Sequence, residues 1–221
     1  MATEKYYRII EKTREYVMRE FSGEGSGHDW WHIYRVHKLS VYIAKKENAD
    51  LFPVEMASLM HELDDWKFNA EGSDKTGHWL QQCQLGNNDI KKIKQIISKV
   101  SFKGAGEKST GLTLEEMVVQ DADRLDAMGA IGIARAFAYG GFKNREIYNP
   151  DIQPVLHKNF SEYKKSQSHT INHFYEKLLL LSGRMNTATA ESLAAKRHQF
   201  IEKFLKEFFN EWNFNEKDNS V

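Results

Sequence analysis

VVQDADRLDAMGAIGIARAF, residues 118–137, is the stretch that does most to decide the fold of this chain. Its pattern predicts a helix that carries the acidic residue Asp123. The residues that follow are unusually small, which lets a neighbouring helix approach closely. These small residues are Gly129, Ala130, Gly132 and Ala134.

Two earlier segments complete a set of metal-ligand side chains. The segment HDWWHIYRV, residues 28–36, contains His32. The segment LMHELDDWKF, residues 59–68, contains His61 followed by Glu62. Two imidazoles and two carboxylates, spread over helical sequence, suit one divalent cation held between helices. Because such a set leaves positions for water, it is typical of a hydrolytic enzyme rather than of a structural metal site.

Helical periodicity extends over almost the whole chain, which contains only three prolines. Thr113 and Glu116 form a capping box that marks the start of the helix carrying Asp123. Residues 141–166 are rich in turn formers and polar groups, and predict an excursion over the surface. The other expected helices cover residues 3–21, 29–48, 53–66, 74–86, 88–100, 168–183 and 187–212. The expected fold class is therefore all-α.

The helical positions of the histidines indicate which of them face inward. His32 shares one stripe of its expected helix with Val36 and Ile43, so it should face the core. His61 and Asp65 share a different face of the next helix, away from its main apolar side. A helix with one apolar side and one side of acids and imidazole is built to line a pocket.

Composition describes a plain globular chain. At 221 residues it is long enough to bury a core and fits a single domain. Lys plus Arg and Asp plus Glu number 31 each, so charge gives no general reason to expect nucleic acid or a membrane as partner. The single Cys83 cannot form an internal disulfide, which favours a reducing compartment. No apolar run approaches about 18 residues and the start MATEKYYRII is charged, so we expect a cytoplasmic protein.

The three motifs resemble those of the HD-domain metal-dependent phosphohydrolases, and most closely the YpgQ-like subgroup. Members of that subgroup carry GHDxxHxxRV, LLHDxxDxKF and VVQDADRLDAxGAIGIAR, which match the three segments quoted above. The likeness continues into INHFYEKLLLL, MNTATAESLA and FFNEWNF. It therefore covers nearly the whole chain, and the third motif alone is long enough to be highly specific.

The resemblance implies a fold and an activity. The implied fold is a single all-helical HD domain over residues 1–212, with a core at 28–130, the helices of 168–212 packed on it, and a polar tail at 213–221. The implied cofactor is Mn²⁺ or Mg²⁺, bound between helices. The implied activity is hydrolysis of phosphate bonds in a small molecule, with release of pyrophosphate from nucleoside triphosphates as the leading reaction.

The resemblance also implies roles for individual residues. By this carry-over the metal ligands are His32, His61, Glu62 and Asp123. Asp65 would orient or deprotonate the attacking water. From the residues alone, Asp121 stays open as the ligand in place of Asp123. One of Asp121 and Asp126 is expected to support a ligand, or Arg124, by hydrogen bonding.

An anionic substrate requires cations near the metal. Arg35, Lys67 and Arg124 flank the three motifs and are candidates for binding a phosphate. Lys99, at a position where related sequences usually have a histidine, is a further candidate, because a protonated lysine can hold a phosphate oxygen. For each of these residues, a solvated surface cation or salt bridge is an equally good interpretation.

Two departures from the family pattern leave a second hypothesis open. Glu62 stands where the family has aspartate, and its extra methylene displaces a carboxylate by roughly 1 Å, against a tolerance of ~0.2 Å in ligand distances. Lys99 cannot ligate a metal while it is protonated. These residues would suit a degenerate HD protein that binds a nucleotide or a partner without turnover. A cyclic-nucleotide phosphodiesterase is a weaker third reading. The sequence leaves the substrate, the native metal and the oligomeric state open.

Overall fold

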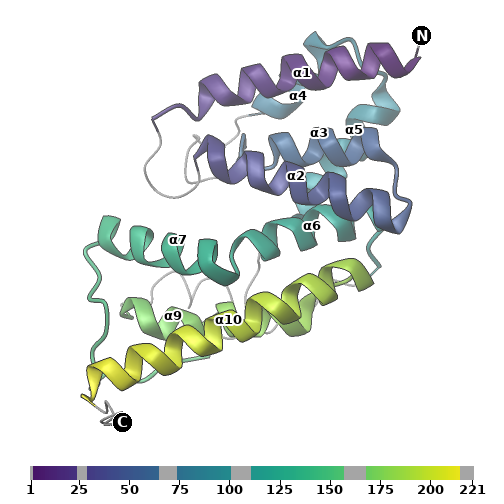
Figure 1. Cartoon of the computed structure of the whole chain (residues 1–221). Coiled ribbons are helices and arrows are strands. Elements are labelled where there is room, and N and C mark those ends of the chain that lie inside the picture. The colour runs from purple at the N-terminus through teal and green to yellow at the C-terminus, as the bar shows by residue number, and fades with distance from the viewer. Residues whose placement is uncertain (1, 24–28, 65–73, 101–110, 157–167, 215–221) are drawn as a thin grey trace, which may run out of the picture.

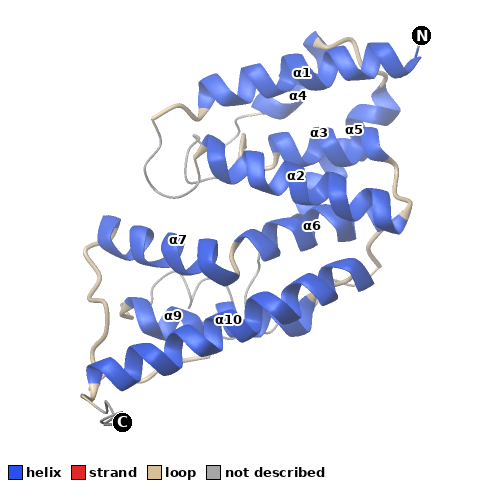
Figure 2. Ribbon diagram, viewed as in Figure 1, coloured by secondary structure: helices blue, strands red, loops and turns tan. Residues whose placement is uncertain are grey.

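The computed structural model of the chain describes residues 2–23, 29–64, 74–100, 111–156 and 168–214. Every regular element within these ranges is a helix (Figure 2), so the all-α class is confirmed. The elements are α1 (Ala2–Glu20), α2 (Trp30–Glu47), α3 (Leu51–Met60), α4 (Lys75–Gln82), α5 (Asn87–Val100), α6 (Leu114–Asp126), α7 (Gly129–Phe142), α9 (Thr170–Glu176), the 3-10 helix η1 (Leu178–Arg184) and α10 (Ala188–Trp212).

Helix α2 lies at the centre of the arrangement, packed against both α3 and α6. Helices α1 and α4 cover one side of this centre, and α9 and α10 form the opposite side (Figure 1). The longest of these, α10, contacts α6, α7 and η1. No helix in the described ranges is both long and apolar enough to cross a lipid bilayer.

Apolar side chains at helical spacing fill the centre, as the sequence predicted. Val36 and Ile43 of α2 are fully buried, together with most of α3. Ile93 and Ile96 of α5 and Leu125 of α6 pack into the same cluster. His32 is also completely buried, which confirms that its face of α2 points inward. The core thus surrounds a polar side chain, that of His32, in the first turn of α2.

The predicted capping box is present at the start of α6. The Thr113 hydroxyl accepts from the backbone N–H of Glu116, whose carboxylate accepts from the N–H of Thr113 at 2.8 Å. A second carboxylate accepts from backbone N–H groups at the start of a helix to which it does not belong. The Asp64 carboxylate accepts from the N–H groups of Lys75 and Thr76, at 2.8 and 3.2 Å, at the start of α4. Asp64 therefore ties the end of the second motif to a different helix.

Several helix boundaries differ from those expected, and α4, for example, ends at Gln82 rather than at Gly86. Helix α3 ends at Met60, not near Trp66, and His61 begins a turn in which the N–H of Leu63 bonds to the Met60 carbonyl. Several acidic residues follow Met60, and negative charge opposes the dipole at a helix C-terminus, which explains the early end. The expected helix 168–183 is broken at Lys177 into α9 and η1.

The small residues after α6 have separate roles. Gly129 opens α7 with a φ of +69°, and a Cβ there would lie 3.1 Å from Cγ of Arg197 on α10. This is the close helix approach that the sequence predicted. A Cβ at Gly132 would instead overlap the carbonyl of Ala127, within the bend between α6 and α7. Ala130 and Ala134 are exposed, so the expectation was wrong for them.

Candidate metal centre

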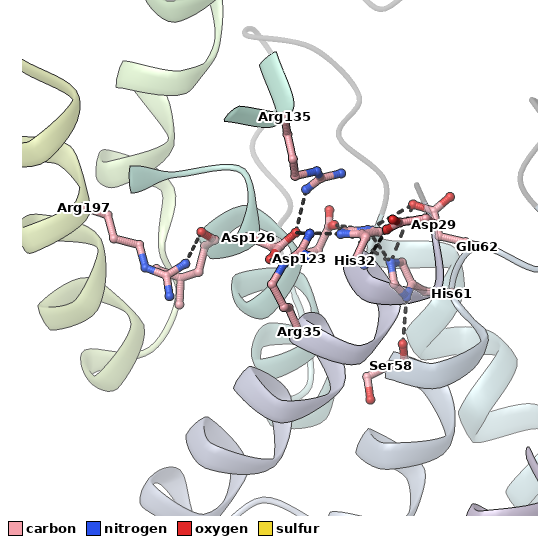
Figure 3. A network of polar contacts seen from close by, with 11 residues as sticks. Asp29, His32, Arg35, Ser58, His61, Glu62, Asp123, Asp126, Arg135 and Arg197 are labelled. Atoms are coloured by element: carbon pink, nitrogen blue, oxygen red, sulfur yellow. Dashed lines mark hydrogen bonds and ion pairs between the residues drawn. The ribbon is translucent and has the colours of Figure 1, made fainter. Parts of the chain in front are cut away.

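Four side chains bring polar atoms together where α2, α6 and the end of α3 meet (Figure 3). His32 Nε2 lies 3.3 Å from His61 Nε2. The same nitrogen is 3.4 Å from Glu62 Oε1 and 3.5 Å from Asp123 Oδ1. His61 Nε2 lies 3.7 and 3.9 Å from these two oxygens. A cation with bonds of about 2.1 Å would hold neighbouring ligands about 3.0 to 3.4 Å apart, so the spacing suits one metal ion.

Three of the four residues form a mutually close group. Ligand atoms of His32, His61 and Asp123 all lie within 4.8 Å of one another. Glu62 stands outside this strict group. Its oxygen is nevertheless closer to each imidazole nitrogen than the Asp123 oxygen is. We therefore treat the four residues together as the metal cluster.

The hydrogen bonds on the far side of each imidazole decide which nitrogen faces the cluster. His32 Nδ1 lies 2.8 Å from Oδ2 of Asp126, and His61 Nδ1 lies 2.8 Å from the carbonyl oxygen of Ser58. Carboxylate and carbonyl oxygens only accept, so both Nδ1 atoms carry hydrogen. In neutral rings, both Nε2 lone pairs then point at each other and at two carboxylate oxygens. Such a donor set fits a divalent cation bound by His32, His61 and Asp123, with the Glu62 oxygen close to both imidazoles.

The charges around His32 favour a cation in the same place. Burial and the nearby Arg135 would by themselves lower the pKa of His32. The hydrogen bonds with Asp126 and Glu62, and the charge of Asp123, instead raise that pKa above its ordinary value. The groups that stabilise a proton on His32 would stabilise a metal ion by the same attraction.

Local structure explains how each side chain reaches the cluster. Asp29 caps α2, accepting from the His32 N–H at 2.9 Å, so that His32 lies in the first turn. Because α3 has ended, the adjacent residues His61 and Glu62 can turn toward the same point, which neighbours on a helix would not do. The Asp123 side chain remains 28% exposed while that of His32 is fully buried, so the cluster opens to solvent on the α6 side.

Two acids on α6 that flank Asp123 face different partners. Both Asp121 oxygens accept from the N–H of Asn186, and one accepts from the N–H and hydroxyl of Thr187. Asp121 therefore joins α6 to the start of α10. Asp126 bonds to His32, which bears out the expectation that one neighbouring acid supports another site residue. Asp123 is the acid of the three that reaches the cluster.

The described cationic residues that were candidates for binding substrate differ in their position relative to the metal cluster and in their hydrogen-bond partners. Arg35 forms a two-pronged contact with Asp126, through Nε at 2.7 Å and Nη2 at 3.1 Å, beside His32. Arg124 donates to the carbonyl oxygen of Arg184. Lys99 is exposed at the end of α5, and its ammonium group has no ion pair with the described residues. Asp65 and Lys67 lie outside the described residues.

Arg135 of α7 is a site residue that the sequence did not reveal. Its Nη1 donates to Asp126 Oδ2 at 2.7 Å, so one carboxylate accepts from Arg35, Arg135 and His32. Burial alone would raise the pKa of Asp126, but the hydrogen bonds from His32 and Arg35 hold it well below its usual range. Arg135 is the last residue of the third motif, VVQDADRLDAxGAIGIAR, so the motif marked the residue, but helical periodicity gave no sign of its contact with Asp126.

Comparison with known proteins places the chain in a family. The family model of the HD domain matches residues 30–128, a span that contains all four residues of the metal cluster. A relative from Bacillus subtilis, the uncharacterized protein YpgQ, is 37% identical over 207 residues, covering 92% of this chain and 93% of YpgQ. The chain belongs to the HD domain family. HD domains bind divalent metals, and the described cluster could hold one.

Solved structures support the same assignment. A Lactobacillus plantarum protein superposes with a TM-score of 0.84 at 37% identity, covering 92% of this chain and 96% of its own. A Bacillus thuringiensis protein described as an HD-superfamily hydrolase gives 0.74 at 39% identity, covering 94% and 98%. The crystal structure of Bacillus subtilis YpgQ in complex with ADP gives 0.72 at 39% identity, covering 91% and 97%. This chain is thus similar, over nearly its whole length, to HD-superfamily hydrolases.

Proposed function

We propose that this protein is a metal-dependent phosphohydrolase that acts on nucleotides, most simply by releasing pyrophosphate from nucleoside triphosphates. The observation that carries the proposal is the cluster of two imidazole nitrogens and two carboxylate oxygens within 3.9 Å of His32 or His61. The ADP bound by the related YpgQ supports a nucleotide as the substrate class. We propose a cytoplasmic location and a single domain over residues 1–212.

In this proposal His32, His61, Glu62 and Asp123 hold a divalent ion, Mn²⁺ or Mg²⁺. Such an ion supplies Lewis acidity, which polarises a phosphoryl oxygen and makes water a better nucleophile. The fixed Nδ1 hydrogen bonds of both histidines keep their Nε2 atoms aimed at the ion. Asp65, four residues after His61 in the sequence, would orient the water and take its proton.

A substrate phosphate also needs positive charge from the chain. Arg35 is suited to this role because it lies next to His32, and its guanidinium is partly exposed and held in place by Asp126. A guanidinium fixed in advance binds a phosphate with less loss of side-chain freedom. Lys67, Lys99 and Arg124 remain proposed contributors on the basis of the sequence.

A nucleotide panel tests this function. Metal-free protein is incubated with ATP, GTP, CTP, UTP and their diphosphates, with Mn²⁺, with Mg²⁺ or with neither, and the products are separated by ion chromatography. We expect turnover only with metal, and equal amounts of monophosphate and pyrophosphate from triphosphates. Release of inorganic phosphate alone would contradict the proposed bond, and turnover without metal would contradict the metal centre.

A binding protein without turnover is the second candidate, favoured by Glu62 in place of the family's aspartate. The geometry weakens this reading, since Glu62 Oε1 is only 3.4 Å from His32 Nε2 despite the longer side chain. Calorimetric titration with ADP separates the two candidates. Tight binding of ADP, with no product from any nucleotide in the panel, would favour the binding protein.

Glu62→Asp tests whether the site is adapted to glutamate. On sequence grounds, restoring the family's residue would improve the metal site. We propose the opposite outcome, because Glu62 is buried and its oxygen lies 3.4 and 3.7 Å from the two imidazole nitrogens. The shorter side chain would withdraw that oxygen by roughly 1 Å, so we expect Mn²⁺ to bind about 10-fold more weakly. Calorimetric titration of both metal-free proteins measures this, and tighter binding by the variant would indicate a decayed site.

A further inference from the structure

One carboxylate behind the metal cluster receives an unusual number of donors. Asp126 accepts from His32 at 2.8 Å, from Arg35 at 2.7 and 3.1 Å, and from Arg135 at 2.7 Å (Figure 3). These three donors come from α2 and α7, while Asp126 ends α6. The Asp126 side chain is 2% exposed, so the contacts are made away from bulk water.

Arg35 and Arg135 keep the Asp126 carboxylate a hydrogen-bond acceptor toward His32. A guanidinium has only donors, and two of them on one buried carboxylate keep it an acceptor. The imidazole facing this carboxylate must therefore place its hydrogen on Nδ1. The opposite nitrogen, Nε2, is then the one that faces His61, Glu62 and Asp123.

We propose that Asp126 is a positioning residue: it fixes His32 as the Nδ1–H tautomer and presents the Nε2 lone pair to the metal, while Arg35 and Arg135 lock the carboxylate in place. The proposal rests on the proposed metal centre. It extends that centre beyond the matched family region, which stops at residue 128, because Arg135 belongs to α7. Asp126 itself lies on the far side of His32 and would not touch the metal.

The decisive variant is Asp126→Asn, which keeps the shape of the side chain but supplies an NH₂ donor. An amide is a weaker acceptor than a carboxylate, and in the orientation that turns its NH₂ group toward His32 it favours the Nε2–H tautomer, in which the nitrogen aimed at the cluster has no lone pair for a metal. Partners behind a ligating histidine typically contribute about 10- to 100-fold to metal affinity. We therefore expect Asp126→Asn to bind Mn²⁺ 10- to 100-fold more weakly.

A spectroscopic measurement separates positioning from a general loss of charge or of structure. Long-range ¹H–¹⁵N correlation of the histidine rings, at about pH 9 where imidazoles are neutral, reads the tautomer in metal-free protein. The wild type should show His32 as Nδ1–H, and Asp126→Asn should show a substantial Nε2–H population. The assignment of the signal comes from its loss in His32→Gln.

Asp29→Asn is the matched control. It also removes one carboxylate charge near His32, at the start of α2 rather than at the end of α6, but asparagine still caps α2, so the tautomer should not change. We expect its Mn²⁺ affinity to stay within about threefold of the wild type. Equal weakening by both variants would overturn the proposal, and so would His32 found as Nε2–H in the wild type, which can be read even if Asp126→Asn fails to fold. Absence of Mn²⁺ binding by the wild type would refute the metal centre instead.

Discussion

His61→Ala is expected to abolish both metal binding and nucleotide hydrolysis. The substitution removes one of the two imidazole nitrogens of the metal cluster, 3.3 Å from the other. The remaining cluster then offers a single imidazole nitrogen, that of His32, to an ion. The structural cost should be small, about 1 kcal/mol, because the imidazole lies in a turn and its hydrogen bond outside the cluster is to Ser58.

Metal content after Mn²⁺ loading and desalting, measured by mass spectrometry, checks this prediction together with the nucleotide panel. His37→Ala is a suitable control, since His37 contacts Glu55 at 3.2 Å and has no contact with the metal cluster in the described structure. The control should keep both metal and turnover. Stoichiometric metal retained by His61→Ala would contradict the assignment of His61 as a ligand.

Replacing Asp121 and Asp123 separately by alanine should have opposite consequences. Asp121→Ala leaves the donors of half-buried Asn186 and buried Thr187 without their acceptor, where α6 meets the start of α10. A buried donor left without an acceptor costs about 1 to 3 kcal/mol, so we expect a loss of about 2 to 4 kcal/mol. For a chain of this length the Tm would fall by about 5 to 15 °C.

Asp123→Ala should leave the Tm nearly unchanged or slightly higher, since in metal-free protein it removes one negative charge from a crowded cluster. It should abolish Mn²⁺ binding. Differential scanning calorimetry and metal titration on both variants give the comparison. An unaltered Tm in Asp121→Ala, with loss of metal, would show that Asp121 is the ligand after all.

The helical class and several local details could be predicted from the sequence because they depend on neighbours within a turn or two. The stripe of Val36 and Ile43 correctly predicted that His32 is buried. The capping box of Thr113 and Glu116 correctly predicted the start of α6. Such signals are local, since both the periodicity and the cap are properties of consecutive residues.

The rest depends on contacts between distant parts of the chain. Asp126 meets Arg35 across 91 positions of sequence, and Asp121 meets Asn186 across 65. Asp121, Asp123 and Asp126 look alike in the sequence, and only their partners distinguish them. Asp121 joins α6 to the start of α10, Asp123 belongs to the metal cluster, and Asp126 hydrogen-bonds to His32. The early end of α3 was missed for a related reason, because apolar spacing continues past Met60 while the helix does not.

The contacts of α6 with the C-terminal half bear on how such a protein can change during evolution. A fragment that stopped at residue 128 would retain the whole matched family region and all four cluster side chains. It would lose Arg135, which holds Asp126, and Arg197 of α10, which donates to the carbonyl of Leu125. The matched family region and the helices α7 and α10 therefore cannot be exchanged independently of each other. Recombination that joined this N-terminal half to a foreign C-terminal half would deliver the four cluster side chains without the residues that orient them.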